Sequence, residues 1–136
     1  MRYLLDTNVF IAAMKGAACV RRRLAQVRQP DLVLSPVVLG ELMLGVEKSL
    51  HREKNAERLR CVTAQIETLP LDASVSECYA RLRAELERQG VPIGANDYWI
   101  AAHALALGAV LVTDNLSEFK RVPGLVVENW LLDADR

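Results

Sequence analysis

Short apolar runs that alternate with amphipathic segments are the feature that most constrains the fold of this 136-residue chain. A short apolar run bounded by turn residues is typical of a buried strand, and apolar residues spaced three and four apart are typical of a helix. Strands separated by helices pair in parallel, because a parallel connection needs a crossover. The alternation therefore predicts an α/β fold with three layers, in which helices flank a central parallel sheet.

The apolar pattern predicts five strands and six helical segments. The expected strands are Arg2–Leu5, Leu32–Leu34, Ile66–Leu71, Ala109–Val112 and Leu125–Val127. The expected helices contain residues 9–13, 20–27, 36–50, 52–65, 73–89 and 98–107. Ser35 and Asp72 are expected to cap the helices that follow them, and either Asn96 or Asp97 is expected to open the last one.

The length and composition fit one domain that covers residues 1–136. Apolar residues make up 51% of the chain, which excludes a disordered polypeptide. No apolar run approaches the ~20 residues that cross a bilayer. The N-terminal apolar run is interrupted at 6–8 by Asp-Thr-Asn and resembles no secretory signal. We therefore expect a cytoplasmic protein without membrane contact.

Basic and acidic residues balance at 17 each, so the whole protein has no net attraction to nucleic acid. Within residues 17–60, however, basic residues outnumber acidic ones. The basic residues of this segment are Arg21, Arg22, Arg23, Arg28, Lys48, Arg52, Lys54, Arg58 and Arg60. The segment is compatible with a local RNA-contacting patch and equally with an ordinary solvated helix surface.

Four acidic residues fall just past strand ends or early in helices, where an open parallel sheet places its ligands. Asp6 follows the first predicted strand, and Glu41 lies in the second turn of the helix after the second strand. Asp97 stands at a helix start, and Asp114 follows the fourth strand. Close carboxylates repel one another unless a cation or a proton compensates them. The pattern predicts a hard divalent ion, Mg²⁺ or Mn²⁺.

Each of these acids also has an ordinary structural explanation. Asp6 and Asp97 fit helix caps, and Asp114 fits a turn. Glu41 is harder to explain in this way, because its helix face is otherwise apolar and burial of an unpaired carboxylate is costly. The polar neighbours of the acids can orient carboxylates and water, or act as caps. These neighbours are Thr7, Asn8, Ser35, Thr113 and Asn115.

Soft metal ligands show no such pattern. Cys19, Cys61 and Cys78 are scattered without metal-ligand spacing, which is typical of reduced thiols. His103 lies in an alanine-rich segment, and we expect a core or subunit-contact histidine with satisfied hydrogen bonds. Zinc chemistry is therefore not predicted.

The same residues resemble the PIN-domain ribonucleases, and within them the VapC-type toxins of bacterial toxin–antitoxin pairs. Four blocks in order carry the resemblance: Leu4–Val9, Ser35–Ser49, Pro92–Ala104 and Leu111–Trp130. The resemblance implies a PIN-like three-layer fold with about five parallel strands. It also implies Mg²⁺-dependent endoribonuclease activity, with Asp6, Glu41 and Asp97 at the acidic positions and with Asp6 and Asp97 as direct metal ligands.

Partners are implied by the same resemblance. VapC-type proteins cleave structured RNA, commonly tRNA, and so stop translation. A VapB-type antitoxin inhibits them through a C-terminal tail that enters the acidic groove. They dimerise, and they reach promoter DNA only through the antitoxin.

The fourth acidic position departs from the family pattern. Many PIN domains carry an acid two residues after the threonine of the last block, where this chain has Asn115. Asp114 and Glu118 are the acids on either side of that position, and we expect Asp114 to complete the pocket with Asn115 as a neutral partner.

Two other functions fit parts of the pattern. An aspartyl phosphotransferase would use Asp6 as a nucleophile, but it needs a second acid at the position of Asn8 and a lysine soon after the fourth strand, and no lysine follows before Lys120. A non-catalytic PIN-like scaffold would bind RNA or proteins without the acids. Metal binding distinguishes the two functions: in a nuclease it should be lost in Asp6→Asn, whereas an inert scaffold should show no such dependence.

Overall fold

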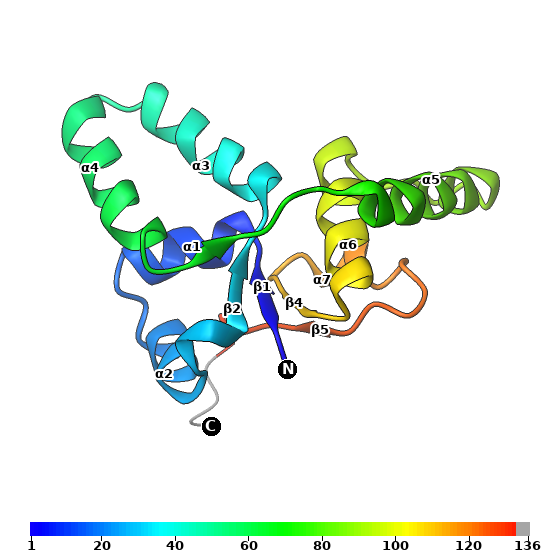
Figure 1. Cartoon of the computed structure of the whole chain (residues 1–136), viewed down its shortest axis with the longest axis horizontal. Coiled ribbons are helices and arrows are strands. Elements are labelled where there is room, and N and C mark those ends of the chain that lie inside the picture. The colour runs from blue at the N-terminus through cyan, green and yellow to red at the C-terminus, as the bar shows by residue number, and fades with distance from the viewer. Residues whose placement is uncertain (133–136) are drawn as a thin grey trace.

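A five-stranded, all-parallel sheet forms the centre of the computed structural model, which describes residues 1–132 (Figure 1). Its strand order is β3-β2-β1-β4-β5. The strands are β1 (Tyr3–Leu5), β2 (Leu32–Leu34), β3 (Glu67–Thr68), β4 (Val110–Val112) and β5 (Val127–Glu128). The predicted α/β class and the parallel sheet are therefore confirmed.

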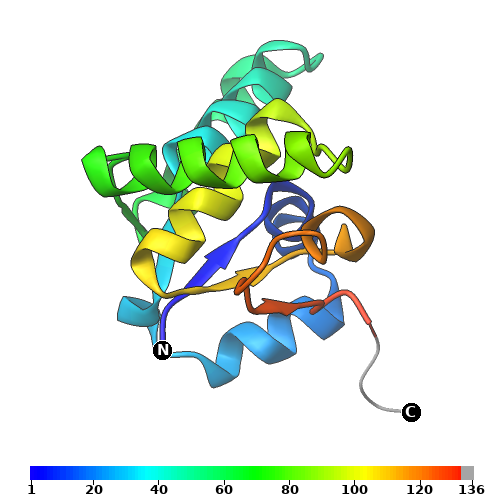
Figure 2. The same cartoon turned by 90° about the vertical axis from the view of Figure 1, so that its right-hand side faces the viewer.

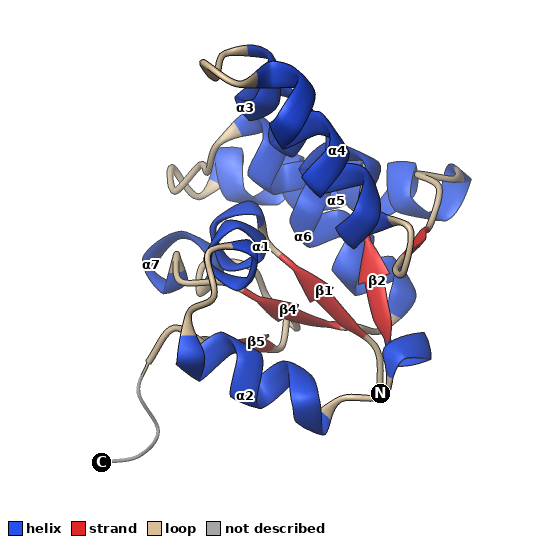
Figure 3. Cartoon of the chain, turned by 90° about the vertical axis from the view of Figure 1, so that its left-hand side faces the viewer, coloured by secondary structure: helices blue, strands red, loops and turns tan. Residues whose placement is uncertain are grey.

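Helices cover both faces of this sheet. They are α1 (Thr7–Met14), α2 (Ala18–Gln26), α3 (Pro36–Glu47), α4 (Arg52–Thr63), α5 (Ala73–Arg88), α6 (Ala95–Leu107) and α7 (Leu116–Phe119), with a 3-10 turn at Gln29–Asp31. Figure 2 shows α2 below β1, β4 and β5, with α5 and α6 above them. Figure 3 shows the same layers from the opposite side, with α3 and α4 forming a hairpin that extends beyond the sheet. None of the described helices is long and apolar enough to cross a membrane.

The central strands are buried on both faces, as a sheet between two helical layers requires. Every residue of β2 and β4 is buried. From β1 the chain moves outward to β2 and β3 and then returns to β4 on the other side of β1. The strand order therefore reverses between β1 and β4, and such a switch point opens a crevice at the carboxyl ends of the strands.

The helix starts at Ser35 and Asp72 agree with the prediction. The Ser35 side chain accepts a hydrogen bond from the Val37 N–H at 3.1 Å, and Asp72 accepts one from the Val75 N–H at 3.2 Å. These bonds satisfy N–H groups that have no partner within the helix.

Several predicted boundaries were wrong. β5 begins two residues after the expected Leu125, because the turn at Gly124 extends to Leu125 and bonds its N–H to the Val122 carbonyl at 3.4 Å. β3 is shorter than Ile66–Leu71, since it is an edge strand and Pro70 has no N–H to donate. The four-residue helix α7 was not predicted.

The start of α6 was also predicted wrongly. Gly94 occupies the N-cap position without a side-chain bond, and helix geometry begins at Ala95. Asn96 and Asp97 therefore lie inside the first turn, where their side chains are free to face the sheet edge instead of capping the helix.

His103 is a core residue of α6, but its hydrogen bonds are not satisfied. It is 0% exposed, and neither ring nitrogen has a hydrogen-bond partner among residues 1–132. Burial lowers the pKa of His103, and nearby Asp72 opposes that shift. The expectation of a satisfied histidine was therefore wrong.

This burial predicts an acid-sensitive contribution to stability. The folded-state pKa of His103 lies below its unfolded value of about 6.5, so the unfolded chain takes up the proton first and stability falls as pH drops below that value. We expect His103→Leu to raise the free energy of unfolding at pH 7 by ~1 kcal/mol, because it removes two unpaired polar atoms. It should also weaken the loss of melting temperature between pH 7 and pH 5.

The exposed histidine His51 provides the matched control. His51→Gln should retain the pH dependence of the wild type. Equal pH slopes for His103→Leu and the wild type would contradict the assignment.

Candidate active site

Asp6 lies at the switch point between β1 and β4. Its backbone N–H donates to the Val112 carbonyl at 2.8 Å, which continues the ladder between the two strands. Its carboxylate accepts bonds from the Thr113 hydroxyl and from the Thr7 N–H, each at 2.8 Å. The side chain is 7% exposed. Asp6 is therefore held by both strand ends and also caps α1.

Glu41 reaches the same place from α3. Its carboxylate accepts a short hydrogen bond from the Thr7 hydroxyl and another from the Asn96 amide at 3.2 Å. Thr7 follows Asp6 in α1, and Asn96 precedes Asp97 in α6. These two bonds join three helices around one acidic group.

Asp97 and Glu118 form a second pair beside Asp6 and Glu41. The two carboxyl groups share a hydrogen bond. Glu118 also accepts bonds from the Gly94 N–H at 2.7 Å and from the Asn115 amide. A Cβ at position 94 would lie 3.2 Å from Asp97 Oδ2 and 3.7 Å from Glu118 Oε1. A side chain at this position would press on the Asp97 carboxyl group and touch that of Glu118.

The electrostatics show that the four acids form one cluster. Burial raises the pKa of Asp6, and the charges of Glu41 and Asp114 add to that shift against the hydrogen bonds from Thr113 and Thr7. Burial, followed by the charges of Glu118, Asp6 and Glu41, raises the pKa of Asp97 to about 7. Near neutral pH, the Asp97 carboxyl therefore keeps its proton more readily than an isolated carboxyl group does.

Glu118 carries the complementary negative charge. Burial alone would raise its pKa, but the bonds from Gly94, Asn115 and Asp97, together with the charge of Arg121, outweigh burial and lower the pKa. Within this pair, Asp97 therefore takes up the proton more readily, and Glu118 more readily carries the negative charge.

The structure brings together the predicted acids Asp6, Glu41 and Asp97. Asp114 is exposed and forms no hydrogen bond with the described residues, although its charge acts on Asp6. Asn115 donates to Glu118, which occupies the place beside Asp97 that the sequence analysis expected for Asp114.

The polar neighbours divide into two groups. Thr7, Thr113 and Asn115 hold carboxylates, as their position next to the acids predicted. Ser35 caps α3, and the exposed Asn8 makes no side-chain hydrogen bond within residues 1–132. Sequence reasoning assigned no role to Gly94 and treated Asn96 only as a possible cap.

The donor set fits a hard divalent ion, since carboxylates and hydroxyl groups are the ligands that Mg²⁺ prefers. Within residues 1–132, no group of three His, Cys, Asp or Glu side chains is already arranged as a metal site. The carboxylates instead bond to neighbouring donors and to one another.

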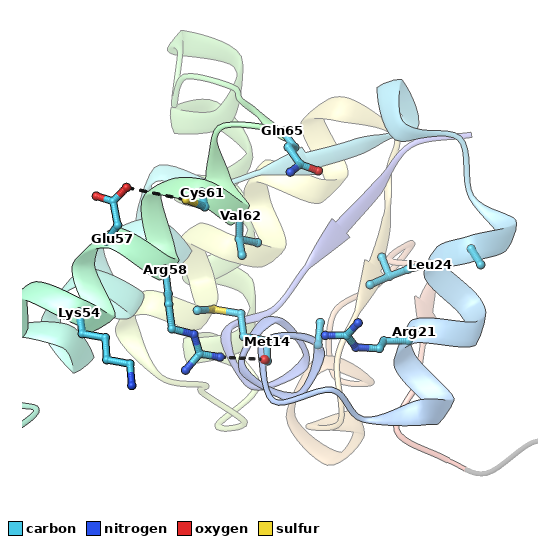
Figure 4. Close-up of a pocket in the computed structure, with 11 residues that line it drawn as sticks. Met14, Arg21, Leu24, Lys54, Glu57, Arg58, Cys61, Val62 and Gln65 are labelled. Carbon is cyan, nitrogen blue, oxygen red and sulfur yellow. Dashed lines mark hydrogen bonds between the residues drawn. The ribbon is translucent and has the colours of Figure 1, made fainter. Parts of the chain in front are cut away.

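A groove with a basic rim lies between α2 and α4 over the end of α1 (Figure 4). Its volume is about 950 Å³. Apolar side chains line much of it, and Arg21, Lys54 and Arg58 lie on its two sides (Figure 4). None of these three cations pairs with a carboxylate among the described residues. We call this the α2–α4 groove.

Other basic residues of the segment 17–60 have ordinary surface roles. Arg23 pairs with Glu128 at 2.7 Å, Arg52 lies 3.8 Å from Glu47, and Arg60 pairs with Glu57. Of the predicted patch, Arg21, Lys54 and Arg58 are the basic residues that line the α2–α4 groove.

Known proteins resemble this chain over nearly its full length. Residues 3–125 match the PIN domain family. Ribonuclease VapC2 of Rickettsia felis is 40% identical over 132 residues, which cover 96% of this chain and 98% of that protein. The tRNA(fMet)-specific endonuclease VapC of Shigella flexneri is 38% identical over 130 residues, with the same two coverages.

The fold has a close counterpart among solved structures. The chain aligns with a TM-score of 0.89 and 39% identity to a protein in the crystal structure of VapBC2 from Rickettsia felis, bound to a DNA fragment from its promoter. The alignment covers 96% of this chain and 99% of the other.

The acidic cluster predicts that removal of one carboxylate stabilises the metal-free protein. Because the folded-state pKa of Asp97 is about 7 and the usual value is about 3.9, stability should fall as pH rises between these values. In chelator at pH 8, we expect Asp97→Asn to raise the free energy of unfolding by ~1 kcal/mol, a figure already reduced for solvent screening. Denaturation at several pH values measures this difference.

The exposed Asp114 is the control for this experiment. Asp114→Asn should change the free energy of unfolding by less than ~0.5 kcal/mol. A less stable Asp97→Asn protein under these conditions would argue against a crowded acidic pocket.

Proposed function

Because this chain belongs to the PIN-domain family, and within it to the VapC ribonucleases, we propose that its acidic cluster is the catalytic centre of an Mg²⁺-dependent endoribonuclease. The observation that carries the proposal is the convergence of Asp6, Glu41, Asp97 and Glu118 at one switch point of the sheet. The presence of four acids argues against a non-catalytic scaffold. The alternative function of an aspartyl phosphotransferase is not needed to explain Asp6, because water can hydrolyse a phosphodiester without an aspartyl nucleophile.

The four acids have different surroundings and therefore different roles. Asp6 and Asp97 would hold the ion directly, since they flank the switch point and the charge of Asp6 contributes to the raised pKa of Asp97. When bound, the ion supplies a Lewis acid that lowers the pKa of a water molecule and neutralises charge on the phosphate. Mn²⁺ offers the same oxygen coordination and is the expected substitute.

Glu41 is positioned to orient the attacking water. The bonds from Thr7 and Asn96 fix its carboxylate, and its position on α3 faces Asp6 across the pocket. A fixed carboxylate can accept a hydrogen bond from water and direct its lone pair to the phosphorus. Asp97 would hold the ion as a charged carboxylate, and its proton would then pass to solvent.

The substrate follows from the relatives. One of them is named a tRNA(fMet)-specific endonuclease. We propose tRNA as the substrate class, with inhibition of translation as the consequence, and tRNA(fMet) as the first candidate to test.

The partner is a VapB-type antitoxin. The similar solved structure is a VapBC complex on promoter DNA, and we propose that this chain, as a homodimer, reaches promoter DNA only through such an antitoxin. The apolar lining of the α2–α4 groove fits an apolar antitoxin segment, and its unpaired cations Arg21, Lys54 and Arg58 fit acidic residues on that segment. A tail that continues to the acidic cluster would exclude RNA.

The function is tested by cleavage of purified tRNA(fMet). We expect cleavage with Mg²⁺ or Mn²⁺, loss of cleavage in chelator, and products with a 5′-phosphate and a 3′-hydroxyl, because water attacks in line. Asp6→Asn and Asp97→Asn should lower kcat by at least about a hundredfold. Mapping of the new RNA ends measures the chemistry, and undiminished cleavage in chelator would refute it.

A second experiment identifies the fourth acid. Because Glu118 bonds to Asp97 whereas Asp114 is exposed, Glu118→Gln should lower kcat about ten- to a hundredfold and Asp114→Asn less than about threefold. Single-turnover cleavage compares the two variants directly. A larger loss in Asp114→Asn would restore Asp114 as the fourth acid.

A further inference from the structure

A second cavity adjoins the acidic cluster, between α1 and the α3–α4 hairpin. Its volume is about 430 Å³, and Glu41 forms part of its wall. The cavity follows α1, which spans ~12 Å, from the cluster to Lys15 just beyond the last turn. We call it the α1–α3 cavity. It begins at a proposed catalytic residue and leads away from it.

Three kinds of group line this cavity. Ile11, Met14, Leu42, Val46 and Leu59 provide the apolar walls. Ser49 and Asn55 add polar groups that bond to each other at 3.0 Å. Lys15 and Arg58 add positive charge, and neither pairs with a carboxylate in the described part of the chain. Arg58 instead donates to the Met14 carbonyl at 3.1 Å.

These three kinds of group match three features of a nucleotide, namely the face of its base, the edge of its base and its phosphate. Apolar walls accept the face of a base, hydroxyl and amide groups bond to its edge, and lysine and arginine bind phosphate. We propose that the α1–α3 cavity binds the nucleotide next to the scissile phosphate, with Lys15 and Arg58 on the adjoining phosphates. This proposal rests on the proposed function and names the subsite that would position RNA for it.

The charges of this cavity favour an anionic ligand such as RNA. Glu41 is its single acidic wall residue, and it lies at the catalytic end. The remaining charged groups are cations that have no carboxylate partner within residues 1–132. The α2–α4 groove shares Met14 and Arg58 with the cavity, so the two spaces meet where Arg58 holds the end of α1.

Two glycines of α3 allow a steric test with a matched control. Gly45 lines the cavity and Gly40 does not, and an added Cβ would meet nothing within 4 Å at either position. Methionine is a better helix former than glycine, so both variants should fold at least as stably as the wild type. Gly45→Met should weaken the binding of bulk tRNA in chelator by at least tenfold and raise KM for cleavage more than it lowers kcat. Gly40→Met should change neither.

A charge test uses Lys15 and a control at the opposite edge of the sheet. Lys15→Gln should weaken tRNA binding and reduce the slope of log affinity against log salt by about one, because one phosphate contact is lost. Arg2→Gln removes a charge at the amino end of β1 and should leave the slope unchanged. The melting temperature of each variant is measured in parallel, and it shows whether weaker binding comes from a lost contact or from a loss of folded protein.

The outcomes separate this inference from the proposed function. Wild-type affinity for tRNA in both Gly45→Met and Lys15→Gln would overturn the inference while leaving cleavage intact. If those variants keep RNA affinity but lose antitoxin binding, the cavity holds a protein segment, which also overturns it. If the wild type cleaves no RNA, the proposed function fails, and the binding measurements still decide whether the cavity takes a nucleotide.

Discussion

Repulsion among carboxylates at one edge of the sheet is the constraint on which the rest of this structure depends. Parallel strands bring Asp6 and Thr113 together at the switch point, and α3 and α6 add Glu41 and Asp97. Hydrogen bonds to three of the acids and a retained proton on the fourth offset the repulsion. The N-terminus of α1 adds a positive dipole end beside Asp6. The residual strain is the electrostatic repulsion among these carboxylates, which a bound cation would relieve.

The sequence predicted the parts of this arrangement that depend on apolar patterning. Strands β1, β2 and β4 are buried on both faces, so their apolar runs are unambiguous, and parallel order then places the residues that follow them at one edge. Asp6 and Glu41 could be found in this way. Edge strands gave poorer boundaries, because β3 and β5 each have two paired residues and one neighbouring strand.

The remaining parts of the site depend on contacts that leave no periodic signal. Glu118 belongs to a four-residue helix, too short for a helical pattern, and its role follows from its contacts with Gly94 and Asp97. Gly94 matters because it lacks a side chain. Asn96 was predicted as a possible cap, but α6 begins at Ala95, so Asn96 lies inside the first turn. Such roles become visible only when distant segments are placed side by side.

Helix α1 connects the chemistry with both candidate binding spaces. It begins directly after its cap Asp6, in the acidic cluster, and ends at Met14, whose carbonyl accepts a hydrogen bond from Arg58. One side of its end borders the α1–α3 cavity and the other borders the α2–α4 groove. A ligand that occupies the groove and draws Arg58 toward its own acidic groups would take that cation from the cavity. An inhibitor could thus weaken RNA binding before its tail reached the catalytic acids, since both ligands need the same guanidinium group.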